Sequence, residues 1–299
     1  MRTRRLYILL IILVVFYSCG GDPKEEKVTR TIDSSGKKSK ENLNISFLLD
    51  LSDRISPEKY PNESMEFYQR DVAYIKSVSE AFVTHLKTKK VREMNDKIQL
   101  YFDPEPKNQN INKISNDLRY KVNRNNASLE ILDEIEQMYS EKPLEIYEYA
   151  IKDSKYVGSD TWRFFKTKIV DYCIDDAYRN ILIVLTDGYI YHKDTKIIES
   201  NRTSYLIPQL VNSLKLNNKN WKETMDNKEL GFISTGMDLS QLEVLVLGIN
   251  PSKKNPYEED VIMKYWSDWL NDMNVKRYEI KTAELPSNVD KIIKQFIIN

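Results

Sequence analysis

Residues 181–185 read ILIVL, and residues 242–249 read LEVLVLGI. Both runs are almost wholly apolar, which is typical of parallel strands that lie under helices on both faces of a sheet. A third apolar run, NISFLL at residues 44–49, ends at Asp50 as a buried strand does. Together these three runs predict the centre of an open, mostly parallel sheet.

Strand and helix patterns alternate around this centre. Further strands are expected at residues 97–102, at residues 118–122 and, as a late edge strand, at residues 277–282. Apolar residues spaced three and four apart predict helices over residues 68–86, 129–138, 143–152, 165–177, 261–269 and 289–296. This alternation predicts a doubly wound α/β fold with helices on both faces of the sheet.

The domain organisation follows from the same patterns. We expect one α/β domain over residues 44–299. Residues 190–238 are polar and interrupt the alternation, with a helix expected near residues 204–214 and little other order. We therefore expect this segment to be an insertion in the domain.

The composition excludes several classes of protein. The chain has 299 residues, 41% of them hydrophobic, which suffices for one or two domains with a substantial core. Its 45 basic and 45 acidic residues balance, so it lacks the basic excess that favours nucleic-acid binding. Two cysteines, Cys19 and Cys173, exclude a small disulfide-framed scaffold. No glycine-rich phosphate loop occurs, so we expect no nucleotide as cofactor.

The N-terminus predicts export. Three arginines within residues 2–5 precede an apolar run at residues 6–17, which is shorter than the roughly 20 residues that span a bilayer. Cys19 follows this run and precedes two glycines, a pattern that resembles the lipobox of bacterial lipoproteins. Asp22, Glu25 and Glu26 resemble the acidic export tags of surface lipoproteins of the Bacteroidetes type, with a plain solvated linker as an equal alternative. Phe16 and Tyr17 are bulkier than the residues usual in a lipobox, and an uncleaved signal anchor is the alternative.

The lipoprotein resemblance has consequences for topology. It implies that residues 1–18 are a signal peptide and that Cys19 carries the lipid and becomes the first residue. Residues 19–43 would then form a flexible tether, because they are polar and contain no apolar cluster. The chain is expected in the cell envelope, lipid-anchored to the outer membrane, and facing either the periplasm or the cell surface.

Oxygen-bearing side chains follow the predicted central strands. Asp50 and Ser52 follow the first strand, Asp187 follows the strand at residues 181–185, and residues 159–161 read Ser-Asp-Thr before a predicted helix. The carboxyl ends of parallel strands meet at one edge of a sheet. Carboxylates and hydroxyls with several waters are what a hard divalent cation such as Mg²⁺ accepts. The sequence therefore predicts a divalent-cation site at this edge.

These motifs resemble the metal-ion-dependent adhesion site of von Willebrand factor A domains, which carry Asp-x-Ser-x-Ser, a middle threonine and Thr-Asp-Gly. Asp50 and Ser52 match the first motif, Asp187 matches the last, and Thr161 takes the threonine position. The resemblance spans residues 44–299 and implies Mg²⁺ or Mn²⁺ at the site. It also implies a protein partner that offers an acidic residue to the metal.

Two positions of the motif stay open. Ser159 or Asp160 replaces Thr161 if the alignment shifts by one or two residues. Arg54 stands where the family has its second serine. Either Arg54 points outward while Ser56 or water takes the coordination position, or its guanidinium bridges the two aspartates in place of a metal.

The function implied by the resemblance is protein–protein interaction or adhesion rather than catalysis. Trp162, Tyr189 and Tyr191 flank the predicted edge and are candidate contacts for the partner, although packing against the insertion is an equal alternative. His192 is expected at the surface, and no nucleophile elbow accompanies it. The alternatives are a metal-dependent hydrolase or transferase that uses the same acidic site, and a structural subunit of an envelope complex whose site is inactive.

Overall fold

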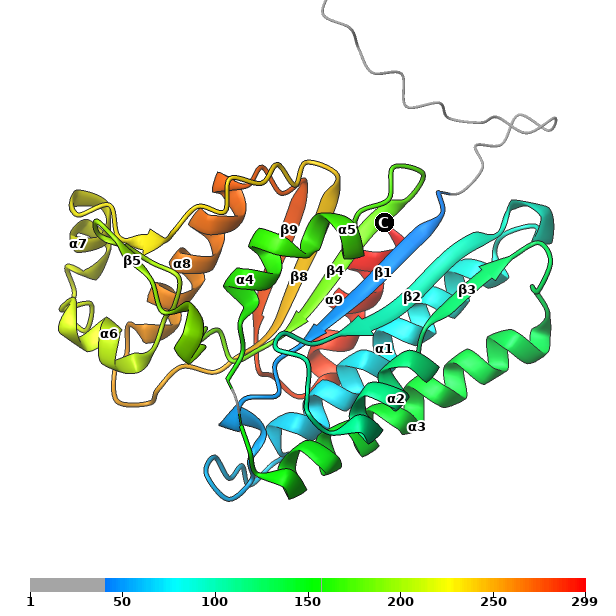
Figure 1. The fold of residues 1–299 in the computed structure, drawn as a ribbon, viewed down its shortest axis with the longest axis horizontal. Helices are drawn as coiled ribbons and strands as arrows, with labels where there is room; N and C mark the ends of the chain where they lie inside the picture. Colours follow the sequence, from blue (N-terminus) through cyan, green and yellow to red (C-terminus); the bar gives the residue numbers. More distant parts are fainter. Residues whose placement is uncertain (1–40, 157) are drawn as a thin grey trace, which may run out of the picture. The chain divides into compact units, whose positions relative to one another are not determined.

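Six strands form the main sheet of the computed structural model in the order β3-β2-β1-β4-β8-β9 (Figure 1). The structure describes residues 41–156 and 158–299, so the predicted signal peptide, Cys19 and most of the tether lie outside the described residues. The strands are β1 (Leu43–Leu49), β2 (Asn95–Tyr101), β3 (Tyr120–Asn123), β4 (Arg179–Leu185), β8 (Leu242–Ile249) and β9 (Arg277–Thr282).

The pairing of the strands confirms the predicted fold class. β1 pairs in parallel with β2 and β4, β8 pairs in parallel with β4 and β9, and only the edge strand β3 runs antiparallel. Leu49 lies opposite Leu185, so the last residues of β1 and β4 reach the same edge of the sheet. Every residue of β1 and β8 is buried, as expected for strands covered on both faces.

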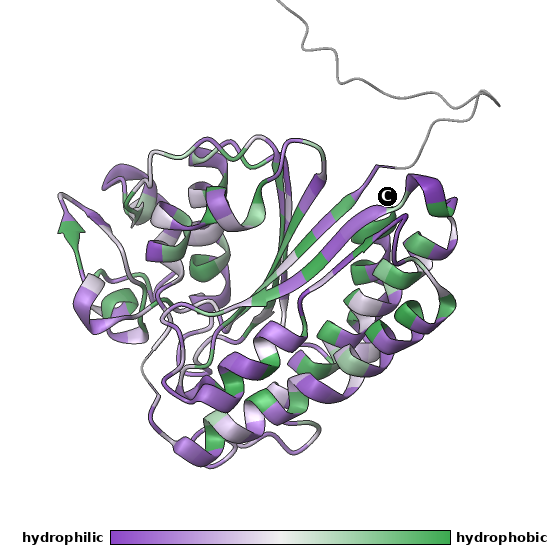
Figure 2. Cartoon of the chain, turned by 45° about the vertical axis from the view of Figure 1, so that its right-hand side comes forward, coloured by the Kyte–Doolittle hydropathy of each residue, from purple (hydrophilic) through white to green (hydrophobic). Residues whose placement is uncertain are grey.

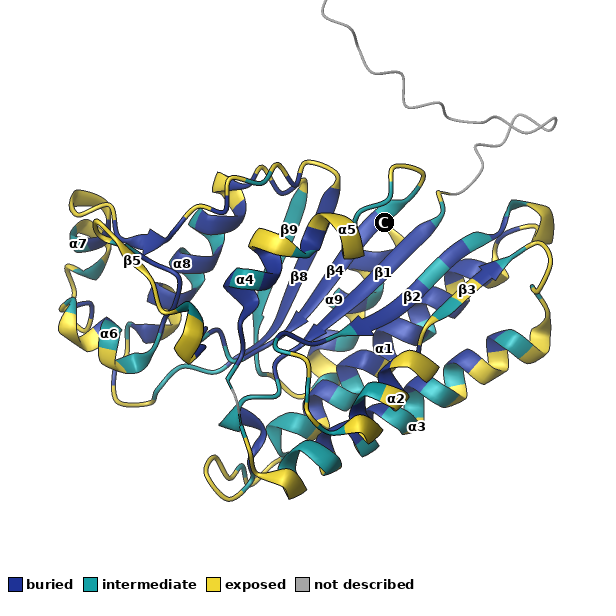
Figure 3. Ribbon diagram, viewed as in Figure 1, coloured by how far each residue is buried: buried dark blue, intermediate teal, exposed yellow. Residues whose placement is uncertain are grey.

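Helices cover both faces of the sheet and create two apolar clusters, one on each side. On one face lie α1 (Phe67–Lys87), α2 (Gln109–Asp117), α3 (Leu129–Asp153) and α9 (Pro286–Ile298). On the other lie α4 (Thr161–Thr167), α5 (Ile169–Cys173) and α8 (Glu258–Asp272). Figure 2 shows hydrophobic residues along the strands, and Figure 3 shows the central strands buried and the outer turns exposed. None of the helices in the described part of the chain has the length and apolar character needed to span a bilayer.

Three helical regions differ from the prediction. α3 continues through Pro143 as one helix, where the sequence predicts two. Proline removes one backbone donor, but burial of Tyr139 and Tyr147 on either side keeps the helix continuous. The helix expected over residues 165–177 is two short helices, α4 and α5, that end at Cys173. The polar helix α2 was not predicted, because it is short and only two of its nine residues, Ile111 and Ile114, are apolar.

The prediction of little order for residues 190–238 is wrong. The helix expected near residues 204–214 is present as α6 (Pro208–Ser213), but the segment also contains β5 (Ile198–Glu199), β6 (Arg202–Thr203), α7 (Trp221–Asn227) and β7 (Gly231–Phe232). Its three strands form a second sheet. Leu206, Val211 and Phe232 are almost fully buried in the cluster that covers the α8 face. These apolar residues are spaced irregularly, so no periodic pattern reveals them in the sequence.

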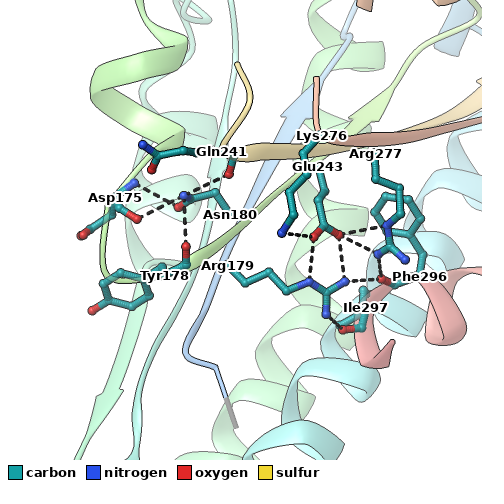
Figure 4. A network of polar contacts seen from close by, with 10 residues as sticks. All are labelled: Asp175, Tyr178, Arg179, Asn180, Gln241, Glu243, Lys276, Arg277, Phe296 and Ile297. Carbon is teal, nitrogen blue, oxygen red and sulfur yellow. Dashed lines mark hydrogen bonds and ion pairs between the residues drawn. The ribbon is translucent and has the colours of Figure 1, made fainter. Parts of the chain in front are cut away.

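A network of charges closes the edge of the sheet where β4, β8 and β9 begin (Figure 4). Arg179 and Arg277 both donate to the buried carboxylate of Glu243, with shortest contacts of 2.9 and 2.6 Å, and Lys276 lies at 3.2 Å. The two arginines also donate to the carbonyls of residues 296–297 at the C-terminal end of α9. Although burial by itself raises a carboxyl pKa, the hydrogen bond from Arg179 and the nearby cations lower the pKa of Glu243 below its ordinary value. Glu243 therefore connects three strands to the last helix.

We expect Glu243→Ala to lower the free energy of unfolding by about 2–3 kcal/mol, because it leaves the guanidinium of Arg179 near-buried without a counter-charge. The loss stays below that of a fully buried pair, since Lys276 and Arg277 reach solvent. Urea denaturation at neutral pH measures this loss in the free energy of unfolding. The control is Glu223→Ala on the exposed side of α7, and equal effects of both substitutions would contradict the role of the network.

Candidate functional site

The loops that follow β1, β4 and β8 surround a cavity of about 740 Å³ at the carboxyl edge of the sheet. Asp50 and Ser52 come from the first loop, Asp187 from the second and Asn250 from the third. The segment before α4 adds Gly158 and Ser159 to the wall. The fold thus brings three of the four predicted metal ligands, Asp50, Ser52 and Asp187, to one cavity.

Asp50 is fixed by two hydrogen bonds and is 2% exposed. Its Oδ1 accepts from the backbone N–H of Ser52 at 2.8 Å, and its Oδ2 accepts from the hydroxyl of Thr186 at 3.0 Å. The hydroxyl of Thr186 also accepts from the N–H of Gly188. The hydroxyl of Ser52 has no hydrogen-bond partner among residues 41–156 and 158–299, so it is available to a ligand.

Asp187 lies half-buried in the same cavity, where its Oδ1 accepts from the N–H of Tyr189 at 3.0 Å. Burial, and then the negative charge of Asp50, raise its pKa to about 7, while Arg54 opposes the rise. A carboxyl group with such a pKa lacks a sufficient counter-charge. The cavity therefore holds two acidic groups that a cation would stabilise.

Arg54 takes neither of the two predicted positions. It is 5% exposed, and its Nη2 lies 2.5 Å from Oδ2 of Asp71 and 3.0 Å from the carbonyl oxygen of Leu185. Its Nε donates to the backbone carbonyl of Asp50 at 3.1 Å and lies 3.6 Å from the Asp50 carboxylate. Arg54 thus points inward but pairs with Asp71 on α1, so it does not bridge Asp50 to Asp187.

Asp71 and Tyr147 are the partners that sequence reasoning missed. The Tyr147 hydroxyl donates to Oδ2 of Asp71 at 2.9 Å, beside the guanidinium of Arg54. Although burial opposes its charge, Asp71 and then Asp50 raise the pKa of Arg54, which stays protonated. The signal for Asp71 was present in the sequence, because an acid stands within the apolar stripe of α1 next to Val72. Tyr147 gave no comparable signal.

The middle segment presents Ser159 to the cavity, whereas Thr161 lies behind it. Thr161 is 1% exposed at the start of α4, and its hydroxyl is 3.0 Å from that of Ser159. Asp160 caps α4 through the N–H of Arg163 and accepts from the hydroxyl of Thr195, so it faces away from the cavity. Ser159, one of the alternatives left open by the alignment, is the hydroxyl that lines the cavity.

Gly158 has a structural reason to be glycine. Its φ is +82°, and a Cβ there would lie 2.2 Å from the carbonyl oxygen of Tyr191. The same carbonyl accepts from the N–H of Ser159 at 3.1 Å. This close approach of two chain segments positions Ser159 in the wall of the cavity.

The aromatic candidates and His192 differ in accessibility. Trp162 is 3% exposed and donates to the carbonyl of Ile233, so it packs against the 190–238 segment and is not available to a partner. Tyr189 is half-buried in the cavity wall, and Tyr191 is 41% exposed beside it. The surface position predicted for His192 is wrong, because His192 is 8% exposed with Nδ1 3.4 Å from Oδ2 of Asp160.

The charges around the site fit a divalent cation. Three carboxylates, those of Asp50, Asp71 and Asp187, share the one guanidinium of Arg54, which leaves two negative charges when all are ionised. Among the described residues there is no group of three or more His, Cys, Asp or Glu side chains that could hold a metal. Two carboxylates with serine hydroxyls suit Mg²⁺, which keeps several of its waters, better than metals that require nitrogen or sulfur ligands.

Comparison with known proteins identifies no family. The sequence matches no family model and no curated protein. Among solved structures, the chain is similar to proximal thread matrix protein 1 from the mussel byssus, with 9% identity, a TM-score of 0.36, and coverage of 86% of this chain and 48% of that one. It is also similar to the pilus adhesin SpaC from Lactobacillus rhamnosus GG, with 12% identity, a TM-score of 0.40, and coverage of 88% and 32%. The chain spans less than half the length of either, and likenesses this distant bear on neither family nor function.

We expect Arg54→Ser to lower the free energy of unfolding by about 3–5 kcal/mol, because it leaves Asp71 buried without its cation. Arg54→Ser combined with Asp71→Asn removes both charges and should recover part of that loss. Urea denaturation of the wild type, both single variants and the double variant measures the coupling. Additive effects of the two substitutions would show that the pair does not interact.

The raised pKa of Asp187 predicts a pH dependence. The folded state favours the neutral form of the Asp187 carboxyl group. The stability that this preference contributes is fully present below the ordinary pKa of 3.8 and is lost as the pH rises through about 7. Between pH 5 and pH 8, we expect Asp187→Asn to reduce the change in the free energy of unfolding by about 1–2 kcal/mol, after allowance for solvent screening in the cavity. The measurement is urea denaturation in EDTA between pH 5 and pH 8. A variant with the same slope as the wild type would contradict the assignment.

Proposed function

We propose that this chain is an exported lipoprotein whose α/β domain resembles a von Willebrand factor A domain and binds a protein partner through a divalent cation. The single observation that carries the proposal is the pair of under-neutralised carboxylates, Asp50 and Asp187, in one cavity at the carboxyl edge of the sheet. The proposal for the cell envelope and for lipidation of Cys19 rests on the sequence of the first 19 residues.

Four side chains would hold the cation: Asp50, Ser52, Asp187 and Ser159, all of which line the cavity. Thr161 supports Ser159 through the contact between their hydroxyls. A bound Mg²⁺ or Mn²⁺ supplies a positive charge with exchangeable coordination positions, which suits a carboxylate oxygen from a partner. Since two of the four ligands are neutral hydroxyls, the site favours an acidic ligand over a neutral one.

Arg54 tunes this site rather than replacing the cation. Its guanidinium lies 3.6 Å from the Asp50 carboxylate, so its charge repels a cation bound there. Its strongest partner, however, is Asp71, and this pairing leaves Asp50 and Asp187 with little of its positive charge. We therefore expect a cation site that is weakened by Arg54 but not abolished.

Binding is favoured over catalysis by the surroundings of the two serines. Within the described residues, neither Ser52 nor Ser159 has a histidine within hydrogen-bonding distance, so no pair of nucleophile and base is formed. His192 is directed by Nδ1 towards Asp160, which is itself committed to capping α4. The second candidate, a metal-dependent hydrolase, would need a general base beside the cation, and Asp187 is itself one of the four side chains proposed to hold that cation.

The test is calorimetric titration of Mg²⁺ and Mn²⁺ into the purified chain after extraction with EDTA. We expect saturable binding that Asp187→Asn abolishes and that weakens as the pH falls below about 7, because the proton and the cation compete for Asp187. The matched control is Asp171→Asn on the exposed side of α5, which should bind as the wild type does. Absence of saturable binding to the wild type at pH 8 would refute the proposal.

A further inference from the structure

The loop after β8 carries two lysines at the cavity. Residues 250–257 read NPSKKNPY and connect β8 to α8, and both Lys253 and Lys254 line the cavity wall. Both lysines are exposed, and among the described residues no carboxylate lies within ion-pair distance of either ammonium group. By contrast, Asp53, which also lines the cavity, is already paired with Lys59 at 2.9 Å.

Hydrogen bonds hold this loop against the segment that carries Asp187. The N–H of Asn250 donates to the carbonyl oxygen of Asp187 at 3.0 Å. The N–H of Ser252 donates to the hydroxyl of Tyr189 at 3.2 Å, and that hydroxyl donates to the buried carboxylate of Glu258 at 2.7 Å. Burial and the contact with Glu258 raise the pKa of Tyr189, so the hydroxyl keeps its proton. These hydrogen bonds fix the position of residues 250–257 relative to Asp187, one of the proposed cation ligands.

The acidic and basic side chains of the cavity come from different loops. The acids come from the loops after β1 and β4, whereas the two unpaired cations come from the loop after β8. The guanidinium of Arg54 is engaged by Asp71, and that of Arg70 donates to the carbonyl of Ala283 and the side chain of Asn62. With a divalent cation at the acids, the cavity would present two distinct positive centres to one ligand.

We propose that Lys253 and Lys254 form a second subsite that binds another carboxylate of the same partner segment, so that the ligand is a protein segment with two acidic residues. This inference rests on the proposed function, in which a first carboxylate meets the cation. Charge complementarity supports the assignment, since both lysines line the same cavity as the cation ligands and neither has an ion-pair partner among the described residues. A volume of about 740 Å³ is within the range that accommodates several side chains.

The experiment uses two fluorescent peptides that differ in one residue: a Gly/Ser peptide with a single Asp, and the same peptide with a Glu three positions later. Anisotropy is measured with the purified chain in saturating Mg²⁺. We expect the two-acid peptide to bind the wild type about five- to tenfold more tightly than the one-acid peptide. Raising the salt concentration should shrink this gain, because the lysines are exposed.

The decisive variant is Lys253→Gln/Lys254→Gln, which removes both charges and changes no buried contact. It should abolish the gain from the second acid while leaving Mg²⁺ affinity and the affinity of the one-acid peptide within about twofold. The matched control is Lys219→Gln/Lys222→Gln, an exposed pair in the 190–238 segment outside the cavity wall, which should keep the full gain.

The outcomes separate this inference from the proposed function. If the one-acid peptide binds in Mg²⁺ but the second acid adds nothing, or the gain survives in the Lys253→Gln/Lys254→Gln variant, the second subsite is refuted and the proposed function stands. If neither peptide binds the Mg²⁺-loaded chain, both proposals fail. If inorganic phosphate of equal charge binds to the two lysines as strongly as the second acid of the peptide does, the lysines bind small anions. The assignment of a protein segment is then overturned.

Discussion

The ion pair between Arg54 and Asp71 organises the carboxyl edge of the sheet. One guanidinium connects the carboxylate of Asp71 on α1 to the backbone carbonyls of Asp50 after β1 and Leu185 at the end of β4. Burying two charges is costly unless their remaining hydrogen-bonding groups are satisfied, and here the two carbonyls and Tyr147 satisfy them. The loops that carry Asp50 and Asp187 thus begin from a fixed position.

The same pair explains why two carboxylates of the cavity lack a close cation. Because Asp71 takes the strongest contact of Arg54, burial and then the charge of Asp50 raise the pKa of Asp187 more than Arg54 lowers it. In the proposed function, a divalent cation bound to Asp50 and Asp187 supplies the missing positive charge. The proposed basic subsite on the loop after β8 adds a second positive centre to the same cavity, which favours a ligand with two negative charges.

The two edges of the sheet have opposite roles. At the edge where β4, β8 and β9 begin, Glu243 and its three cations close the surface and hold the end of α9. At the carboxyl edge, the hydroxyl of Ser52 lines a cavity and has no hydrogen-bond partner among the described residues. Polar groups satisfied within the protein at one edge contribute stability, and those left open at the other are available to a ligand.

The local sequence pattern predicts the strands of the main sheet. The apolar run at residues 242–249 coincides with β8, because burial on both faces leaves a pattern that a single chain displays. Residues 277–282, predicted as an edge strand, coincide with the half-buried edge strand β9. The sequence also placed Asp50, Ser52 and Asp187, since a residue that follows a parallel strand must lie at the carboxyl edge.

Only the tertiary structure decided the partner of Arg54, the choice of Ser159 over Thr161, and the order within residues 190–238. Asp71 lies 17 positions from Arg54, and the pair forms because packing α1 against β1 and β4 buries both groups together. Such contacts depend on which side chains the fold brings side by side, and no periodicity in the chain records them.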